Sequence, residues 1–212
     1  MPSPLRFVFA VHLHQPVGNF DSVFEQHLAD VYRPFLEKVD ERGFLPVVLH
    51  LSGPLLEWLE RHDPGYLDQL ARLAGDGRLE LLCGGMYEPI LASLPRQDRV
   101  EQVGWLREAI ARRFGVNPTG LWLTERVWEP DLAADLVDAG VRQLVVAGGE
   151  TSGACVQALG IAQLRIGAQI DPGVPWCHAL SPAAPQGLHL TLKSGNVGGE
   201  DFFTRAFEVL RT

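Results

Sequence analysis

The stretch RFVFAVHLHQP, residues 6–16, begins as an apolar run and ends in polar side chains. Its first part, Arg6–Leu13, is rich in valine and aromatic residues, which predicts a buried β-strand. His12 and His14 stand two residues apart at the end of this strand, so their side chains lie on the same side of it. The same order, an apolar strand followed by polar residues, recurs outward along the chain.

Further strands are predicted at residues 46–51, 79–82, 120–124, 141–146, 162–166 and 188–192. Helices are predicted at residues 23–41, 55–60, 65–74, 99–114, 131–139, 152–159 and 202–210. Strands joined through helices predict a mainly parallel sheet with helices outside it, and ligands at the carboxyl ends of its strands. We therefore expect an α/β protein that is parallel, (β/α) barrel-like, with about seven strands, and incomplete or hybrid. A flattened open sheet is the alternative, because barrel closure needs a matched strand number and stagger.

The composition and net charge exclude several classes of partner. Hydrophobic residues make up 46% of the 212 residues, enough for the packed core of one domain or of two small ones. The net charge of −8 and the lack of a basic patch argue against nucleic acid as a partner. No apolar run is long enough for a signal peptide or a membrane span, so no membrane partner is expected. The cysteines Cys83, Cys155 and Cys177 are widely spaced and form no CxxC, which favours a reducing, cytoplasmic location.

Two carboxylates follow different predicted strands and are flanked by aromatic residues. Glu88 follows Tyr87, and Glu125 lies between Trp122 and Trp128. Aromatic rings stack on the apolar faces of sugars while polar side chains bind the hydroxyl groups, so this pattern suits a sugar site. A retaining glycosidase needs two carboxylates about 5–5.5 Å apart, one as nucleophile and one as acid/base.

These residues also allow other interpretations. His12 and His14 could belong to a metal site, but no third ligand stands at a telling spacing, so no metal is predicted. The tryptophans could be core residues. The pairs Glu88-Pro89 and Glu129-Pro130 could simply mark a strand exit or a helix start.

Residues 5 to about 140 resemble the N-terminal part of the catalytic barrel of glycoside hydrolase family 57. The stretches that support this are HLHQPVGNF (12–20), YRPFLE (32–37), HLSGPLLEWLE (50–60), GRLELLCGGMYEPILASLP (77–95) and GLWLTERVWEPDLAADLVDAG (120–140). That family contains α-amylase-like enzymes, 4-α-glucanotransferases, amylopullulanases and α-glucan branching enzymes. The resemblance implies an α-1,4-glucan or maltooligosaccharide as partner, no cofactor for the glycosidase reaction, and most similarity to the 4-α-glucanotransferase and amylase branch.

The same resemblance implies roles for single residues. Glu125, in WLTERVWEP, corresponds to the catalytic nucleophile. The residues that match the donor-sugar subsite are His12, His14, Gln15, Glu88, Trp122, Arg126 and Trp128. The family's acid/base aspartate, in a DDGE-like motif, has no counterpart here. Asp201 stands in roughly the region where a replacement would be needed, but we do not assign it that role. We therefore expect an α-glucan site with weak or absent turnover.

A glycine-rich segment follows the fifth predicted strand. Gly148 and Gly149 would let a ligand approach the backbone closely, and Thr151 and Ser152 could donate hydrogen bonds to an anion at a helix N-terminus. Lys193, after a later strand, could add a positive charge. This pattern is typical of phosphate binding, although GGETS is not a Walker A sequence and such a loop can simply turn the chain.

Residues from about 141 to 212 resemble the C-terminal nucleotide-binding part of the four-carbon acid sugar kinases. The matching stretches are GGETSGA, LRIGAQIDPGVPW and LKSGNVGGEDFF. This resemblance implies ATP with Mg²⁺ as cofactor, held by Gly148, Gly149, Glu150, Thr151, Ser152 and Gly195. The chain thus looks like a chimera or truncated hybrid, with a family 57-like half barrel at 1–140 and a kinase-like segment at 141–212 packed in the same sheet. The competing hypotheses are an adenine-nucleotide-binding fragment and an inactive scaffold.

Overall fold

The structure is a computed structural model that describes residues 9–43, 47–194, 197–199 and 202–211. The chain divides into two compact units, Val8–Val127 and Trp128–Thr212, called here the N-terminal unit and the C-terminal unit. The boundary precedes the helix α6 (Leu132–Asp138), whereas the sequence predicted it after that helix. The reason is packing, because Ala133 and Val137 of α6 are buried in the core of the C-terminal unit.

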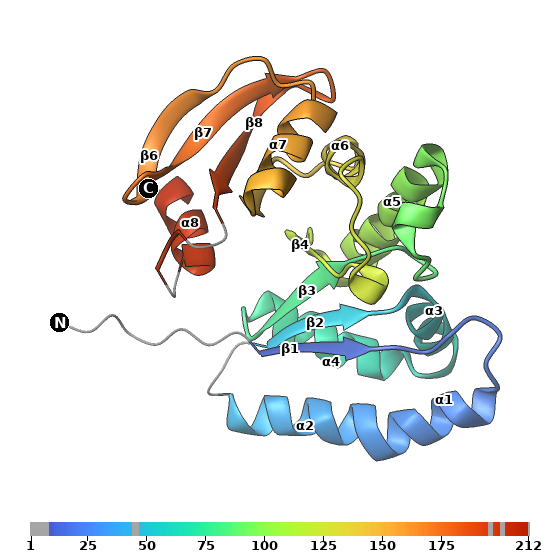
Figure 1. The fold of residues 1–212 in the computed structure, drawn as a ribbon. Coiled ribbons are helices and arrows are strands. Elements are labelled where there is room, and N and C mark those ends of the chain that lie inside the picture. Colours follow the sequence, from blue (N-terminus) through green and yellow to red (C-terminus); the bar gives the residue numbers. More distant parts are fainter. Residues whose placement is uncertain (1–8, 44–46, 195–196, 200–201, 212) are drawn as a thin grey trace. The chain divides into compact units, whose positions relative to one another are not determined.

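The N-terminal unit is built on a parallel sheet, as predicted (Figure 1). Its strands β1 (Phe9–Leu13), β2 (Val47–Leu51), β3 (Leu79–Cys83) and β4 (Gly120–Leu121) lie in the order β1-β2-β3-β4. The fourth strand is shorter than predicted, since only Gly120 and Leu121 pair with β3. Four strands ending along one edge bring the polar residues that follow them together.

Helices flank this sheet. They are α1 (Asp21–His27), α2 (Arg33–Arg42), α3 (Gly53–His62), α4 (Pro64–Gly75) and α5 (Arg96–Phe114). A π-helical turn at Leu28–Tyr32 joins α1 to α2, so the single helix predicted for residues 23–41 is present with a local widening. Short 3₁₀ turns cover Leu91–Ser93 and Thr124–Arg126.

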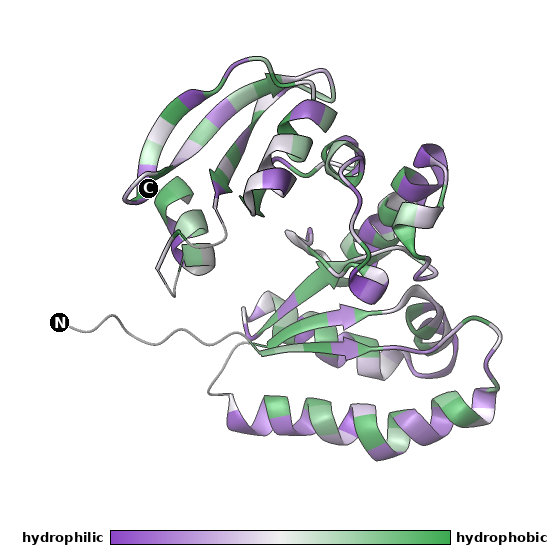
Figure 2. Cartoon of the chain, in the orientation of Figure 1, coloured by the Kyte–Doolittle hydropathy of each residue, from purple (hydrophilic) through white to green (hydrophobic). Residues whose placement is uncertain are grey.

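Local sequence explains where these helices begin and what they bury. Pro54 and Pro64 lie in the first turns of α3 and α4, where the missing N–H has no intrahelical partner to lose. The Asp63 side chain caps α4 by accepting a hydrogen bond from the Tyr66 backbone N–H, at 3.1 Å. Polar and apolar residues alternate along α1 and α2 in stripes, while β1 to β3 are largely apolar (Figure 2). The core is rich in fully buried leucines, among them Leu36, Leu49, Leu55, Leu59, Leu67 and Leu70.

The C-terminal unit contains a second, mixed sheet. After α6 come β5 (Gln143–Ala147), α7 (Gly149–Ala158), β6 (Arg165–Asp171), β7 (Val174–Ser181), β8 (Ala184–Lys193) and α8 (Phe202–Arg211). The strands lie in the order β5-β8-β7-β6. β5 and β8 are parallel, whereas β8, β7 and β6 are joined antiparallel.

This arrangement corrects two expectations. The strands described for residues 141–212 pair with one another in a mixed sheet, whereas a mainly parallel one was predicted. The prediction of parallel strands at 162–166 and 188–192 also missed β7 and the hairpins on either side of it. The turns at Pro172-Gly173 and Pro182-Ala183 have two residues each, and so short a connection can join only antiparallel strands. Gly173, at φ 78°, adopts a left-handed conformation that glycine reaches without a steric penalty.

Two clusters of buried residues stabilise the C-terminal unit. One joins α6, α7 and the sheet through Val137, Leu144, Cys155 and Leu190. The other joins α8 to β6 and β7 through Ile170, Val174, Trp176, Phe202 and Ala206. None of the helices described is long and apolar enough to cross a membrane.

Candidate active site

Strand register brings two histidines together at the carboxyl end of the first sheet. His12 of β1 and His50 of β2 are direct partners in the parallel ladder. Their Nδ1 atoms lie 2.8 Å apart, so one ring donates a hydrogen bond to the other. His14 follows β1 directly, and its ring centre is 5.4 Å from that of His12.

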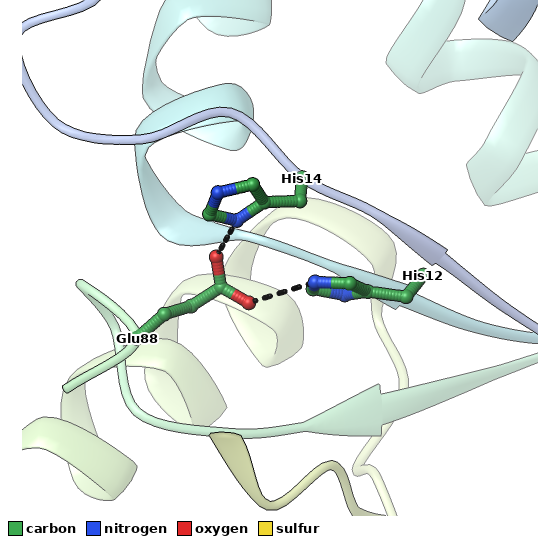
Figure 3. A group of neighbouring side chains, drawn as sticks. All are labelled: His12, His14 and Glu88. Carbon is green, nitrogen blue, oxygen red and sulfur yellow. Dashed lines mark hydrogen bonds and ion pairs between the residues drawn. The ribbon is translucent and has the colours of Figure 1, made fainter. Parts of the chain in front are cut away.

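Glu88, in the loop after β3, reaches back to these rings (Figure 3). Its Oε2 atom bonds to Nδ1 of His14. Its Oε1 atom lies 3.3 Å from Nε2 of His12 and 3.7 Å from Nδ1 of His50. The Glu88 side chain is only 6% exposed, so its carboxylate depends on the histidines for partners.

Burial sets the charge of this group. It lowers the pKa of His50 to about 3, with smaller contributions from the positive charges of His12 and His14, so the fully buried His50 ring is neutral at pH 7. Burial, followed by the charge of His14, also lowers the pKa of His12. Burial raises the pKa of Glu88; the hydrogen bond and charge of His14 oppose this rise, and the charge of Glu125 adds to it. The result is a carboxyl group of raised pKa beside a neutral His50 ring and a His12 ring of lowered pKa.

Close packing behind His50 fixes its ring. A Cβ atom placed on Gly84, which follows β3, would lie 2.6 Å from Nε2 of His50. Only a glycine therefore fits at this position without movement of the ring. The ring in turn holds His12 through the Nδ1 contact, so Gly84 acts on the site through His50.

Trp122 forms an aromatic wall beside the histidines. Its backbone N–H donates to the carbonyl of Cys83 at 2.7 Å, which places the residue directly after β4. Its ring stacks on that of His12, with ring centres 4.7 Å apart and planes inclined by 16°. Such a flat ring next to hydrogen-bonding groups suits a molecule that has both apolar and hydroxyl-bearing faces.

Glu125 and Arg126 lie in a 3₁₀ turn with unusual backbone geometry. Both have φ 56°, and Glu88 has φ 52°, although none of the three is glycine. Left-handed conformations of this kind cost on the order of 1–3 kcal/mol each and cluster at functional sites. Glu125 and Arg126 are exposed, so a ligand can reach both side chains.

Most of these side chains, but not His50, line one cavity of about 240 Å³ in the N-terminal unit. Its lining residues are His12, His14, Glu88, Trp122, Thr124, Glu125 and Arg126. The sequence had pointed to six of these residues separately, and the structure places them around one space. Thr124 was not predicted.

Two residues predicted for the same site have other surroundings. Gln15 does not line the cavity. It is buried, its Nε2 donates to the Tyr32 hydroxyl and its Oε1 accepts from Asn19, so it anchors the loop after β1. Trp128 is 40% exposed and is the first residue of the C-terminal unit.

His50 was missed, although the sequence contained a signal for it. β1 and β2 both end in His-Leu, at residues 12–13 and 50–51, and adjacent parallel strands of equal length pair these positions. A register argument applied to the two strand ends would have placed His50 beside His12.

The glycine-rich segment lies at the end of β5. Gly148 has φ 110° and precedes α7, while Gly149, Glu150, Thr151 and Ser152 form the first turn of that helix rather than a loop. Ala147 pairs with Lys193 across β5 and β8, so the segment and the lysine lie at the same edge of the second sheet. The Ser152 hydroxyl is buried without a hydrogen-bond partner among the described residues, and Glu150 is exposed. Gly195 and Asp201 lie outside the described residues.

Comparison with known proteins decides the family. The sequence model of glycosyl hydrolase family 57 matches residues 8–162 of this chain. This range includes every residue that lines the cavity. The chain belongs to glycosyl hydrolase family 57. The match extends beyond residue 140, where the motifs read from the sequence end.

Individual relatives support this assignment. A 4-alpha-glucanotransferase of Thermococcus litoralis is 46% identical over 142 residues, which are 67% of this chain and 21% of that protein. An alpha-amylase of Pyrococcus abyssi is also 46% identical over 142 residues, which are 67% of this chain and 22% of that protein. The crystal structure of the Thermococcus litoralis 4-alpha-glucanotransferase superposes on 88% of this chain and 27% of that one, with a TM-score of 0.63 and 37% identity. This family 57 chain therefore spans about a fifth of the length of these relatives.

A second similarity accompanies the family 57 match. A 3-oxo-tetronate kinase of Pseudomonas savastanoi pv. phaseolicola is 50% identical over 103 residues, which are 49% of this chain and 23% of that protein. The 142 residues matched by the glucanotransferase and these 103 residues together exceed the length of the chain, so the two similarities overlap. This family 57 chain thus also contains sequence similar to a sugar-acid kinase.

Proposed function

We propose that the cavity of the N-terminal unit binds an α-1,4-glucan, with Glu125 as the nucleophile of a retaining glycosidase or glucanotransferase site. The observation that supports this most is that His12, His14, Glu88, Trp122, Glu125 and Arg126 line one space. The four parallel strands would then correspond to part of a (β/α) barrel of the family 57 type. No cofactor is needed for this chemistry.

Each side chain has a role that follows from its surroundings. Trp122, stacked on His12, offers an aromatic face to a pyranose ring. Glu88 is held by His14 and faces His12, so this group can bind the hydroxyl groups of the same sugar. Arg126 adjoins Glu125 and, if its guanidinium group turns inward, favours the ionised carboxylate that a nucleophile needs.

The reaction would proceed in two steps. A Glu125 oxygen attacks the anomeric carbon while the glycosidic C–O bond breaks and the leaving oxygen takes a proton from an acid. Water, or the hydroxyl of a second glucan, then attacks the glycosyl-enzyme, releases Glu125 as a carboxylate and gives its proton to the group that served as the acid in the first step. No residue of this chain is assigned as the acid. Loss of general acid catalysis typically costs about 10²–10⁴-fold, so we expect binding with weak or absent turnover.

Calorimetric titration with maltohexaose tests the proposal. Trp122→Phe and Glu88→Gln should each weaken binding at least about tenfold, since the first shrinks the stacking face and the second removes the charge of a buried acceptor. Trp105→Phe is the matched control, because Trp105 is an exposed tryptophan of the same unit that does not line the cavity. Equal affinity in all three variants, or no heat with the unmodified chain at millimolar sugar, would show that the cavity is not a glucan site. Glu125→Gln should bind the sugar while abolishing any residual turnover.

A second proposal concerns the C-terminal unit, which we propose binds an adenine nucleotide with Mg²⁺. It is supported by the 50% identity with a 3-oxo-tetronate kinase and by the pairing of Ala147 with Lys193, which brings the glycine segment and a lysine to one sheet edge. The backbone N–H groups in the first turn of α7 would face the phosphates.

Titration with ATP and ADP separates this proposal from the first. Binding at millimolar nucleotide that Gly148→Val abolishes and Trp122→Phe leaves unchanged would support it. A side chain at Gly148 would conflict with its φ of 110° and would lie 3.3 Å from the Thr151 hydroxyl. No heat with either nucleotide would eliminate it.

A further inference from the structure

The Glu88 carboxylate and two imidazoles converge closely enough to serve as metal ligands. One ligand atom each from His12, His14 and Glu88 lies within 4.8 Å of the other two. Figure 3 shows both rings turned toward the carboxylate from the end of β1, with Glu88 approaching from the loop after β3. In the sequence His12 and His14 stand two residues apart, whereas Glu88, predicted there as a sugar-binding residue, lies 74 residues beyond His14.

One spacing within this group, that between His12 and Glu88, matches a cation site. In a tetrahedral zinc site with bonds of about 2.0–2.2 Å, neighbouring ligand atoms lie about 3.4 Å apart. The Nε2 atom of His12 and the Oε1 atom of Glu88 are 3.3 Å apart. Two histidines and one glutamate form a donor set that zinc uses in proteins when its fourth position stays open.

Glu88 supplies an independent observation. Its side chain is more than nine-tenths buried, and its Oε1 atom has no hydrogen-bond partner among the described residues. That atom points toward Nε2 of His12, at 3.3 Å. A buried carboxylate oxygen without a hydrogen bond is costly, and a bound cation would remove that cost.

His50 orients the neighbouring ligand. The Nδ1 atom of His12 is engaged by Nδ1 of His50, so Nε2 is the His12 nitrogen left for a ligand on the Glu88 side. Metal-binding histidines are typically held through their second nitrogen in this way, which fixes the ring and the tautomer. His50 itself is fully buried against Gly84 and cannot turn away.

We propose that His12, His14 and Glu88 bind a divalent transition-metal cation, with zinc as the best fit to this donor set. The open position of the metal would face the cavity that these residues line. The proposal does not depend on glucan binding, because it concerns the metal alone. Bound zinc would, however, occupy the place of a sugar hydroxyl next to Glu88.

The test is calorimetric titration of the full chain with zinc chloride, after EDTA treatment, in a buffer that does not bind zinc. We expect one zinc ion per chain. Glu88→Gln and His14→Gln should each lower the affinity by more than about 100-fold, because even loss of a residue that only supports a ligand costs about 10–100-fold. Gln at position 88 preserves the volume of the buried side chain, and circular dichroism spectra confirm folding of each variant.

A second histidine pair provides the matched control. His178 and His189, in the C-terminal unit, have ring centres 5.2 Å apart and belong to no group of three ligands in the described part of the chain. His189→Gln should leave the zinc affinity unchanged. Cobalt substitution adds a spectroscopic test, because visible d–d bands should appear in the unmodified chain and in His189→Gln but not in Glu88→Gln. Zinc binding that survives Glu88→Gln and His14→Gln, or no binding at all, would overturn the proposal.

Discussion

Replacing Gly84 with alanine should destabilise the N-terminal unit through a single steric conflict. The added Cβ would lie 2.6 Å from Nε2 and 3.3 Å from Cδ2 of His50, and 3.3 Å from the carbonyl oxygen of Trp122. Ordinary contacts of this kind are 3.4–4 Å, so something must move by several tenths of an ångström or more. The His50 ring has no exposed surface and is held by His12, so the movement must spread through the site.

The size of the effect follows from two opposing contributions. Overpacking a dense core typically costs about 1–3 kcal/mol. The φ of Gly84 lies outside the left-handed region, so alanine adds no backbone strain there and lowers the entropy of the unfolded chain by the equivalent of about 0.4–1 kcal/mol. We therefore expect Gly84→Ala to lower the free energy of unfolding by about 1–2 kcal/mol.

Urea unfolding followed by circular dichroism measures this difference. Gly104→Ala is the matched control, because Gly104 lies inside α5 with nothing within 4 Å of its added Cβ. Alanine there should raise stability by about 0.5–1 kcal/mol. The reasoning fails if both variants unfold at the same urea concentration, or if Gly84→Ala is as stable as the unmodified chain.

Three further predictions follow from other parts of the structure. Burial raises the pKa of Cys83 to about 11, so at pH 8 only about one thiol in a thousand is ionised. Its reaction with a thiol reagent should therefore be much slower in the folded protein than in the protein unfolded in urea. Equal reaction rates in the folded and unfolded protein would contradict this. At Asp40 partial desolvation raises the pKa, but hydrogen bonds from Arg72, Gln69 and Arg78 outweigh it and hold the pKa below its usual value. The folded state is therefore stabilised above pH 4, this contribution is lost as the pH falls through the lowered pKa, and Asp40→Asn should flatten acid unfolding curves below about pH 4. The Arg126→Gly variant should unfold at a higher urea concentration than the Arg126→Ala variant. Both substitutions remove the charge, but only glycine relieves a left-handed conformation that costs about 1–2 kcal/mol. Identical unfolding midpoints would show that the backbone of Arg126 is not strained.

The first sheet could be predicted because buried parallel strands read as continuous apolar runs. Arg6–Leu13 and Pro46–Leu51 have that pattern, and the structure places β1 and β2 within these ranges. The polar residues after each strand then indicated the edge where a site would form. What the pattern does not contain is register, and for that reason His50 was overlooked although it pairs with His12.

The second sheet was predicted less well because its strands do not share this pattern. Most of β6 is exposed, with Ile166 at 74%, so its apolar content does not mark it as a core strand. The turn at Pro172-Gly173 lies within LRIGAQIDPGVPW, a stretch that the kinase resemblance explains without assigning a two-residue hairpin to it. Turn length, which decides between antiparallel and parallel pairing, would have corrected this error.

The cavity of the N-terminal unit illustrates how a site can be assembled from local rules. Every lining residue follows, or lies at the end of, one of the parallel strands β1, β3 and β4. The ladder determines where the strands end, but it does not turn the carboxylates inward. Glu88 and Glu125 themselves have left-handed backbone conformations, which bend the chain after the strands of the sheet. Because such conformations are unfavourable for any residue but glycine, the fully buried leucine core must supply the stability that keeps them in place. Among the described residues, the left-handed non-glycine positions are these two glutamates and Arg126, and none of the three lies in a strand of the sheet that supports the site.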